Sequence, residues 1–320
     1  MTVAIVGAGI AGLVAGDVLS RAGVPTVIFE AASQPGGRLA TRRIGNDGAD
    51  SGAQFFTVRD PRFQALVDEW LRKDLVFCWS NGFSDGRSAP FDGYPRYAAR
   101  QGMGALAERL ASSLDVQLAQ RVSEIAPDGD RWRIHLVDGH VTAATGVLLT
   151  PPLPEALPLV ATAIPPAIWR RLAAIRYRRT LSAIVAVEAS VLPHPGAVQR
   201  PSARLAFVAD NQRKGLATSP LLTIHASPDW SDALWPLADD AVLGKLIDEA
   251  RPYFRGRSGA SVLDRWAFAL PETVLPERFV AVGSLIFAGD AFAGPRVEGA
   301  VLSGIAAGER LASLLPSSGA

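Results

Sequence analysis

Cysteine and lysine are both scarce in this sequence of 320 residues. The single cysteine, Cys78, excludes an intramolecular disulfide and any zinc or iron–sulfur site held by several cysteines, and nothing indicates an oxidising compartment. Only Lys73, Lys214 and Lys245 stand among 32 basic residues, against 31 acidic ones. The resulting net charge of +1 gives no strong field that would attract nucleic acid or an anionic membrane.

Long apolar runs are also missing. No stretch reaches the roughly 18 apolar residues that a membrane-spanning helix needs. The apolar opening has no basic residue before it and ends at Asp17, unlike a secretory signal peptide. We therefore expect a soluble, cytoplasmic protein with neither a membrane nor a nucleic acid as partner, and its length allows two closely packed domains.

The first thirty residues predict a strand, a glycine turn, a helix and a second strand. The turn has the spacing G-x-G-x-x-G, in which Gly7 permits the tight turn and Gly9 lets a pyrophosphate approach the backbone. Gly12 would let the helix pack closely against the sheet. Ile10 and Ala11 lie in the first turn of the helix, where free N–H groups and a partial positive charge favour phosphates.

Glu30 follows the second predicted strand. A carboxylate there can accept hydrogen bonds from both ribose hydroxyls of an adenosine, and it disfavours the 2′-phosphate of NADP. The alternative is an apolar helix start whose glycines are incidental. The order of strand, turn, helix and Glu30 favours dinucleotide binding.

The residues after Glu30 favour FAD over NAD. Gly36 and Gly37 would let the backbone lie against a large planar cofactor, and Arg38 can bind pyrophosphate oxygens through its planar guanidinium. An NAD-binding domain usually continues directly into further strand–helix units. Here residues 31–60 are rich in glycine and lack periodicity, which is typical of a functional segment.

A second cofactor-binding segment is predicted near the C-terminal end. The apolar strand 285–289 ends in Gly289 and Asp290, and this aspartate could bind a ribityl hydroxyl. A helix beginning near Arg296, Val297, Glu298 and Ala300 would direct its N-terminus at the flavin pyrimidine ring and stabilise the charge of the reduced flavin. Alternatively, Asp290 is a plain helix cap.

Periodicity organises the rest of the chain into further helices and strands. Helices are expected over 61–73, from 102, over 165–173 and over 239–251, and strands across 116–150 and over 181–187, 205–208, 221–225 and 261–270. We predict an α/β fold: a Rossmann-type FAD-binding domain interleaved with an α+β substrate domain built on a mixed sheet. The FAD-binding domain would comprise residues 1–72, 101–173 and 276–320, and the substrate domain residues 73–100 and 174–275.

Together these motifs resemble the glutathione-reductase/p-hydroxybenzoate-hydroxylase flavoproteins on their amine-oxidase branch, and renalases in particular. The shared segments are Gly7–Gly12, Gly36–Arg38, Gly52–Thr57 with Asp60, Arg62 and Phe63, Gly102–Met103, Ile224–Ala226 with Trp230–Ser231, Arg265–Trp266, Gly289–Asp290 and Arg296–Ala300. The resemblance implies non-covalent FAD, with Ala53, Gln54 and Phe55 beside the flavin. It also places Val122 near the adenine, although Val122 is equally consistent with a core valine.

The resemblance implies an oxidase that takes a hydride from 2- or 6-dihydro-NAD(P) and passes the electrons to O2, giving H2O2. Such a substrate needs no strong acid or base, which fits the lack of a Ser/His/Asp or Cys/His constellation and of a metal site. We expect His225 and Trp230 in the substrate wall, with Gln54 and Phe55 facing the flavin. The alternative is a satisfied buried histidine and a core tryptophan.

Other functions stay open at this point. They are a flavin amine oxidase or desaturase of a small substrate, a non-catalytic FAD-binding protein, and an NAD-dependent dehydrogenase. Lys214 is expected in a loop, Lys245 on a surface helix, and Cys78 as an inert core residue. The C-terminal segment has no cysteine for a thioether link, so FAD should be released on denaturation.

Overall fold

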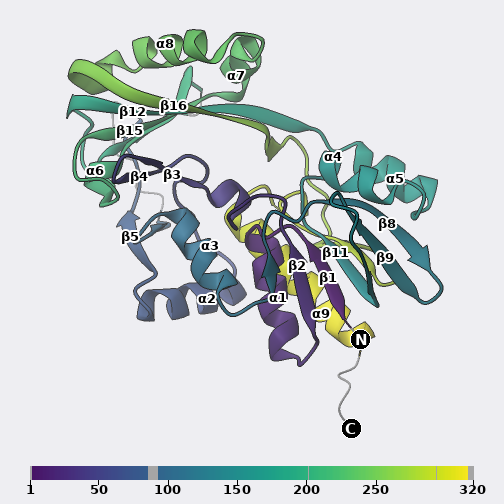
Figure 1. Cartoon of the computed structure of the whole chain (residues 1–320). Coiled ribbons are helices and arrows are strands. Elements are labelled where there is room, and N and C mark those ends of the chain that lie inside the picture. Colours follow the sequence, from purple (N-terminus) through teal and green to yellow (C-terminus); the bar gives the residue numbers. More distant parts are fainter. Residues whose placement is uncertain (1, 86–92, 201, 293, 316–320) are drawn as a thin grey trace. The chain divides into compact units, whose positions relative to one another are not determined.

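The computed structural model describes residues 2–85, 93–200, 202–292 and 294–315, and its chain forms two compact units (Figure 1). Unit 1 consists of Met1–Gly37, Ala107–Arg176 and Pro271–Ala320, and unit 2 of Arg38–Leu106 and Tyr177–Leu270. Residues 38–72, which we expected in the FAD-binding domain, lie in unit 2. The assignment of FAD binding to the segments named above therefore stays a prediction.

Unit 1 is built on a six-stranded sheet in the order β17-β18-β11-β1-β2-β7 and a smaller sheet in the order β10-β9-β8. Its elements are β1 (Val3–Val6), α1 (Ile10–Arg21), β2 (Thr26–Phe29), β7 (Val116–Gln117), β8 (Val122–Asp128), β9 (Arg131–Leu136), β10 (Val141–Ala144), β11 (Gly146–Leu149), α4 (Leu153–Ala156), η2 (Leu157–Val160), α5 (Pro166–Ala173), β17 (Val280–Val282), β18 (Leu285–Phe287) and α9 (Val297–Leu314). The large sheet is mixed, because β17 pairs antiparallel with β18 while the other pairs are parallel. The predicted α/β fold with a Rossmann-type domain is confirmed.

Helices α1 and α9 pack backbone to backbone in unit 1, as the purple and yellow helices of Figure 1 show. A Cβ atom at Gly304 would lie 2.3 Å from the Ala11 carbonyl oxygen, and one at Gly308 would lie 3.1 Å from that of Ala15. Only glycine permits this approach. The glycines of α9 therefore help to fix where α1 begins, and α1 carries the predicted phosphate-binding end.

Unit 2 is built on a five-stranded sheet in the order β13-β14-β15-β12-β16. Its elements are η1 (Gly37–Leu39), β3 (Thr41–Ile44), β4 (Asp47–Asp50), α2 (Pro61–Arg72), β5 (Val76–Ser80), β6 (Arg96–Ala99), α3 (Met103–Ala111), β12 (Tyr177–Ser190), β13 (Ala197–Gln199), β14 (Leu205–Asp210), α6 (Asn211–Lys214), β15 (Leu221–Ala226), α7 (Pro228–Leu234), α8 (Asp239–Glu249), η3 (Arg251–Tyr253) and β16 (Phe254–Pro271), of which η1, α3 and β16 extend across a boundary between the units. Pairs β13–β14, β14–β15 and β12–β15 are antiparallel.

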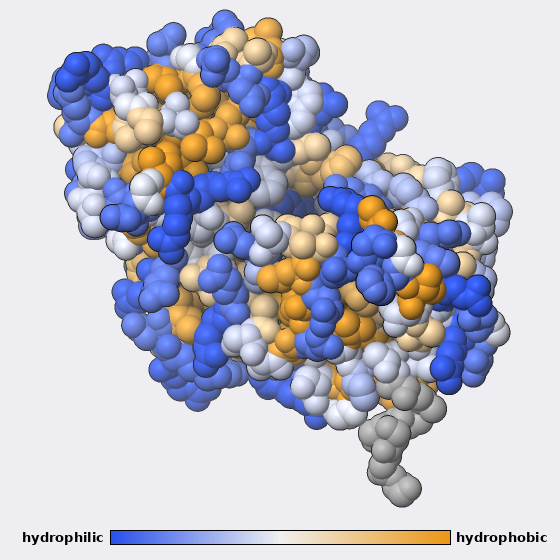
Figure 2. Space-filling model, viewed as in Figure 1, coloured by the Kyte–Doolittle hydropathy of each residue, from blue (hydrophilic) through white to orange (hydrophobic). Residues whose placement is uncertain are grey.

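One face of this sheet is covered by an apolar layer that includes residues of α7 and α8. Leu222, Ile224 and Ala226 of β15 belong to it, and Trp230 and Leu243 of the two helices pack against it. On the face shown in Figure 2, apolar side chains of unit 2 reach the surface just below α8. The alternate residues of β15, Thr223 and His225, point to the opposite face of the sheet.

Two expectations about secondary structure were wrong in detail. The stretch 31–60 is not wholly irregular, because β3 and β4 form a hairpin whose turn contains Gly45 at φ +60°. Strands β12 and β16 are longer than predicted. Most of the residues they gain are polar residues or glycines that are not buried, so they show no apolar pattern. Within the described ranges, no helix is long and apolar enough to cross a membrane.

Candidate functional site

The turn after β1 in unit 1 needs glycine at two positions for reasons internal to the protein. Gly7 has φ +96°, a conformation that side chains disfavour. A Cβ atom at Gly12 would lie 2.1 Å from the Gly7 carbonyl oxygen. The Thr150 hydroxyl, which no sequence pattern marks, donates to the Val6 carbonyl oxygen at 2.8 Å and to that of Gly7 at 3.1 Å. It holds the turn to β11.

Gly9 differs, because the protein itself does not require glycine there. Its φ is −72°, and an added Cβ atom would meet nothing within 4 Å. Gly36 donates to the Ala8 carbonyl at 2.8 Å, and a Cβ atom at Gly37 would lie 3.8 Å from the Gly9 Cα. The backbone at the N-terminus of α1 is therefore not covered by side chains of the described residues and faces open space. This arrangement fits a diphosphate, which binds to free N–H groups at the positive end of a helix.

Glu30 is fixed at the end of β2 by two backbone donors. Its Oε2 accepts from the Ala8 N–H at 2.7 Å and its Oε1 from the Ala32 N–H at 2.9 Å. Two carboxylate oxygens together offer about four acceptor positions. Glu30 therefore keeps capacity for ribose hydroxyls, as its predicted role requires.

The C-terminal segment of the predicted site also lies in unit 1. Gly289, at φ +134°, lies two residues after β18, and its N–H donates to the buried hydroxyl of Ser303 in α9 at 2.8 Å. Asp290 follows and is 8% exposed. Helix α9 begins after Arg296, its N-cap residue, with Glu298 in its first turn. A buried serine thus connects the turn before Asp290 to the helix predicted to face the flavin.

Val122 and Arg38, two other residues predicted to contact the cofactor, also make contacts within the protein. Val122 is 6% exposed in β8 and pairs with Leu136, which suits either of its two expected roles. Arg38 begins unit 2, and its guanidinium donates to the carbonyls of Phe268 and Ala269 at 3.1 Å each. Its carbonyl accepts from Ala53 at 2.9 Å. Arg38 therefore has a structural role inside unit 2 beside any role at a phosphate.

His225 and Trp266 share one acceptor in unit 2. His225 Nε2 lies 3.0 Å from the Ser51 carbonyl oxygen, and Trp266 Nε1 donates to the same oxygen at 3.2 Å. Because a carbonyl only accepts, Nε2 carries the proton. Burial lowers the pKa of His225 to about 4, so the ring is neutral near pH 7. Its Nδ1 is then an acceptor, with no hydrogen-bond partner among the residues that the structure describes.

The structure does not bring Trp230 to the face of the sheet that carries His225. Trp230 packs against the apolar layer that contains Ile224, whereas His225 alternates onto the other face. This geometry favours the alternative of a core tryptophan. Phe55 is connected to His225 through Phe207, whose ring centre lies 5.8 Å from that of Phe55 and 6.2 Å from that of the imidazole.

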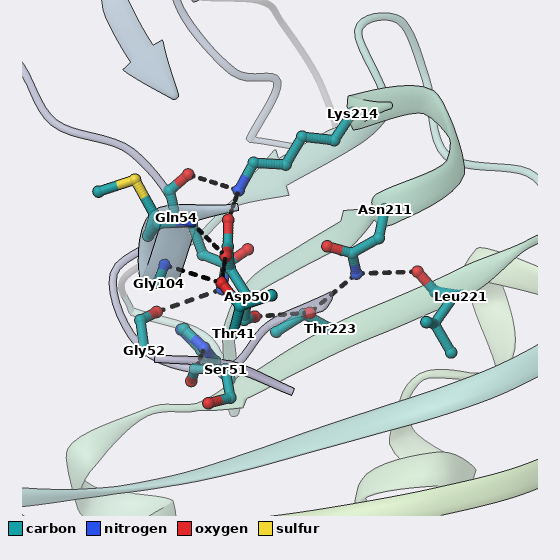
Figure 3. A network of polar contacts seen from close by, with 12 residues as sticks. Thr41, Asp50, Ser51, Gly52, Gln54, Gly104, Asn211, Lys214, Leu221 and Thr223 are labelled. Atoms are coloured by element: carbon teal, nitrogen blue, oxygen red, sulfur yellow. Dashed lines mark hydrogen bonds and ion pairs between the residues drawn. The ribbon is translucent and has the colours of Figure 1, made fainter. Parts of the chain in front are cut away.

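A buried ion pair in unit 2 was missed from the sequence. Lys214 does not lie in a loop but ends α6, and its side chain is fully buried 2.7 Å from that of Asp50. Figure 3 shows this pair within a network that includes Gln54, Thr41 and Thr223. Cys78, expected in the core, is exposed on β5. The scarcity of lysine was the only signal available, and it did not indicate which lysine is buried.

Comparisons with known proteins point to one family. The model of the flavin containing amine oxidoreductases matches residues 78–312, and that of an NAD(P)-binding Rossmann-like domain matches residues 5–70. The chain belongs to the flavin-containing amine oxidoreductase family. The description of this family implies a flavin cofactor, and the more specific renalase resemblance remains a prediction.

Individual relatives agree with this family. The L-amino-acid oxidase of Gloydius halys is 42% identical over 71 residues, which are 22% of this chain and only 14% of that protein. A structure provisionally named protoporphyrinogen oxidase, from Exiguobacterium sp. 255-15, has a TM-score of 0.73 at 16% identity and covers 97% of this chain and 98% of its own. A putrescine oxidase variant redesigned in its cofactor binding has a TM-score of 0.69 at 16% identity, covering 98% and 100%. These two structures show the fold alone.

Proposed function

We propose that this oxidoreductase binds FAD non-covalently and oxidises 2- or 6-dihydro forms of NAD(P), with O2 as the electron acceptor. The open space at Gly9 is the observation that carries the cofactor assignment, because no described residue comes within 4 Å of a Cβ atom placed there. Glu30, Gly36, Gly37 and the turn at Gly7 would hold the adenosine and diphosphate. Bound FAD would supply hydride acceptance at N5 and return the electrons to O2 as H2O2.

The neutral state of His225 supports the choice of substrate. A dihydronicotinamide releases a hydride without first losing a proton, so a neutral imidazole that accepts a hydrogen bond at Nδ1 suffices. The carboxamide N–H of a nicotinamide is such a donor. His225 and Gln54 would orient the ring, and Phe55 would exclude water. The scarcity of cysteine supports non-covalent FAD and a cytoplasmic location.

Amine oxidation is the second candidate, because the family and the L-amino-acid oxidase segment favour it. Anaerobic mixing of the FAD-loaded protein with each reductant separates the two. We expect rapid loss of the visible flavin absorbance with 6-dihydro-NADP and none with putrescine or L-amino acids. The opposite result replaces the proposal with the amine oxidase, and no reduction by either class leaves a non-catalytic FAD-binding protein. Denaturation should release all FAD into the supernatant.

A further inference from the structure

The ammonium group of Lys214 is completely withdrawn from solvent in unit 2. It donates to Oδ2 of Asp50 and to the carbonyl oxygen of Gln54, both at 2.7 Å (Figure 3). It also lies 4.7 Å from the centre of the Trp79 ring. An ammonium has three donors and no acceptor. The two hydrogen bonds and the Trp79 ring are therefore the contacts that compensate the buried charge of Lys214.

The two hydrogen bonds of Lys214 fall at the two ends of the loop 50–54. The other oxygen of Asp50 accepts from the Thr41 hydroxyl at 2.6 Å and from the Met103 N–H at 2.8 Å. Lysine and aspartate together thus join this loop to helix α6, the β3–β4 hairpin and the start of α3. The Lys214 side chain thus connects the two ends of the loop.

Two carbonyl groups of the loop are directed at the sheet of unit 2. The Asp50 carbonyl accepts from the Thr223 hydroxyl at 2.9 Å, and the Ser51 carbonyl accepts from His225 and Trp266. In contrast, the N–H groups of Gln54 and Phe55 make no hydrogen bond with any described residue. The Oε1 atom of Gln54, a residue only 5% exposed, is likewise buried without a described partner. The Nε2 atom of Gln54 donates to the Asp50 carbonyl at 2.5 Å and to the Gly52 carbonyl at 3.2 Å. The loop therefore uses one end of the Gln54 amide and leaves its Oε1 atom, like the N–H groups of Gln54 and Phe55, without a described partner.

Stability alone is a poor explanation for a fully buried ion pair. Removing two charges from water costs several kcal/mol per ion, and well-packed apolar residues often replace such a pair without loss. Burial lowers the pKa of Lys214, and the attraction of Asp50 opposes this only in part. An apolar pair could not hold the loop in one orientation, because apolar contacts have no preferred direction. Each hydrogen bond of Lys214, in contrast, fixes the position of one atom of the loop.

We propose that Lys214 is a positioning residue, which closes the loop 50–54 through Asp50 and the Gln54 carbonyl and so sets the geometry of Gln54 and Phe55. This inference rests on the proposed function, in which Gln54 orients the nicotinamide ring and Phe55 excludes water. In this proposal Lys214 contacts neither the flavin nor the substrate, because its ammonium group is fully buried among protein atoms. Its effect reaches the chemistry through the backbone of Gln54.

The test compares Lys214→Met with Lys245→Met, which removes an exposed lysine from α8 in the same unit. A double variant, Lys214→Met with Asp50→Asn, avoids leaving a buried charge unpaired and serves if the single variant does not fold. Three quantities are measured on FAD-loaded protein: hydrogen exchange of peptides covering 50–56, the visible spectrum of the flavin, and anaerobic flavin reduction at varied reductant concentration.

We expect faster exchange confined to 50–56 and an altered flavin spectrum in the Lys214 variants. The limiting rate constant of reduction should fall at least about tenfold, as for a misplaced catalytic group. The apparent dissociation constant of the reductant should change less than about threefold, because ground-state binding is kept. Lys245→Met should match the wild type in all three measurements.

Unchanged exchange at 50–56 would overturn the inference, and so would faster exchange with an unaltered spectrum and reduction rate. Failure of the proposed function is distinguishable from both. If neither dihydronicotinamides nor amines reduce the wild-type flavin, the proposed substrate is wrong, and the exchange and the flavin spectrum alone decide the role of Lys214. If the limiting rate constant of reduction and the affinity for the reductant fall by the same factor in both Lys214 variants, the ion pair has only a structural role.

Discussion

The phosphate-binding turn of unit 1 and the loop 50–54 of unit 2 are both short segments next to a strand. Different interactions hold them in place. The turn consists of neighbouring residues, and glycine backbone and helix N–H groups shape it. The loop 50–54 is held by side chains from Thr41, Lys214, His225 and Trp266, which are far apart in the sequence. A diphosphate needs only backbone donors and a helix end, whereas presenting selected side chains requires a framework of other side chains.

This contrast predicts where each region is vulnerable. The turn should tolerate most side-chain changes except at its glycines, because its contacts come from the backbone. The loop should tolerate changes in its exposed groups but not in its buried donors and acceptors. Four predictions test the contrast, beginning with the largest expected effect.

Gly9→Val should yield a folded protein that contains no FAD. The added side chain meets no protein atom within 4 Å of its Cβ but occupies the space expected for the diphosphate. Absorbance of the purified protein and thermal unfolding measure the two quantities. The matched variant Gly12→Val should instead lose stability, because its Cβ atom would collide with the Gly7 carbonyl oxygen at 2.1 Å. Normal FAD content in Gly9→Val would refute the assignment of this turn.

Asp50→Asn should lower the free energy of unfolding by about 3 kcal/mol, because it leaves the buried Lys214 charge without a partner. Chemical denaturation measures this quantity. Glu69→Gln is the control, since it removes one partner of an exposed pair with Lys73 and should cost at most about 1 kcal/mol. Equal effects of the two substitutions would contradict the view that burial makes the pair in unit 2 critical.

Glu30→Ala should weaken FAD binding by about 1.5–3 kcal/mol, the range for hydrogen bonds to a charged group. Part of this loss would come from the turn, since Glu30 accepts from the Ala8 N–H. Titration of the FAD-free protein with FAD gives the affinity. Asp17→Ala, which breaks an exposed pair with Arg21 on α1, should leave that affinity unchanged. An unaltered affinity in Glu30→Ala would remove Glu30 from the site.

The smallest expected effect is the contribution of His225 to the pH dependence of the free energy of unfolding. Its pKa is about 4 in the folded protein against 6.5 ordinarily, so the unfolded chain takes up this proton first as the pH falls. His225 should therefore destabilise the fold progressively between about pH 6.5 and 4, and His225→Gln should reduce that slope. Denaturation at several pH values measures it. A slope unchanged by the substitution would mean that His225 is not held neutral.

Much of unit 1 could be predicted because its signals are local. The apolar run 3–6, the glycine spacing 7–12 and the apolar strand before Gly289 each report their own backbone conformation. The same locality explains the errors in unit 2. Strands β3 and β4 are four residues long and carry Arg42 and Arg43 without apolar alternation, so nothing nearby indicated a hairpin.

The sequence alone determined the Rossmann-type turn, the order of most helices and strands, and the flavin class, because these follow from contiguous patterns. Only the tertiary structure decided that Lys214 is buried against Asp50, 164 residues away along the chain, and that Trp230 and His225 point to opposite faces of a sheet. Neither fact has a local signature. A charge is buried where distant segments supply its partners, and those segments meet only once the chain has folded.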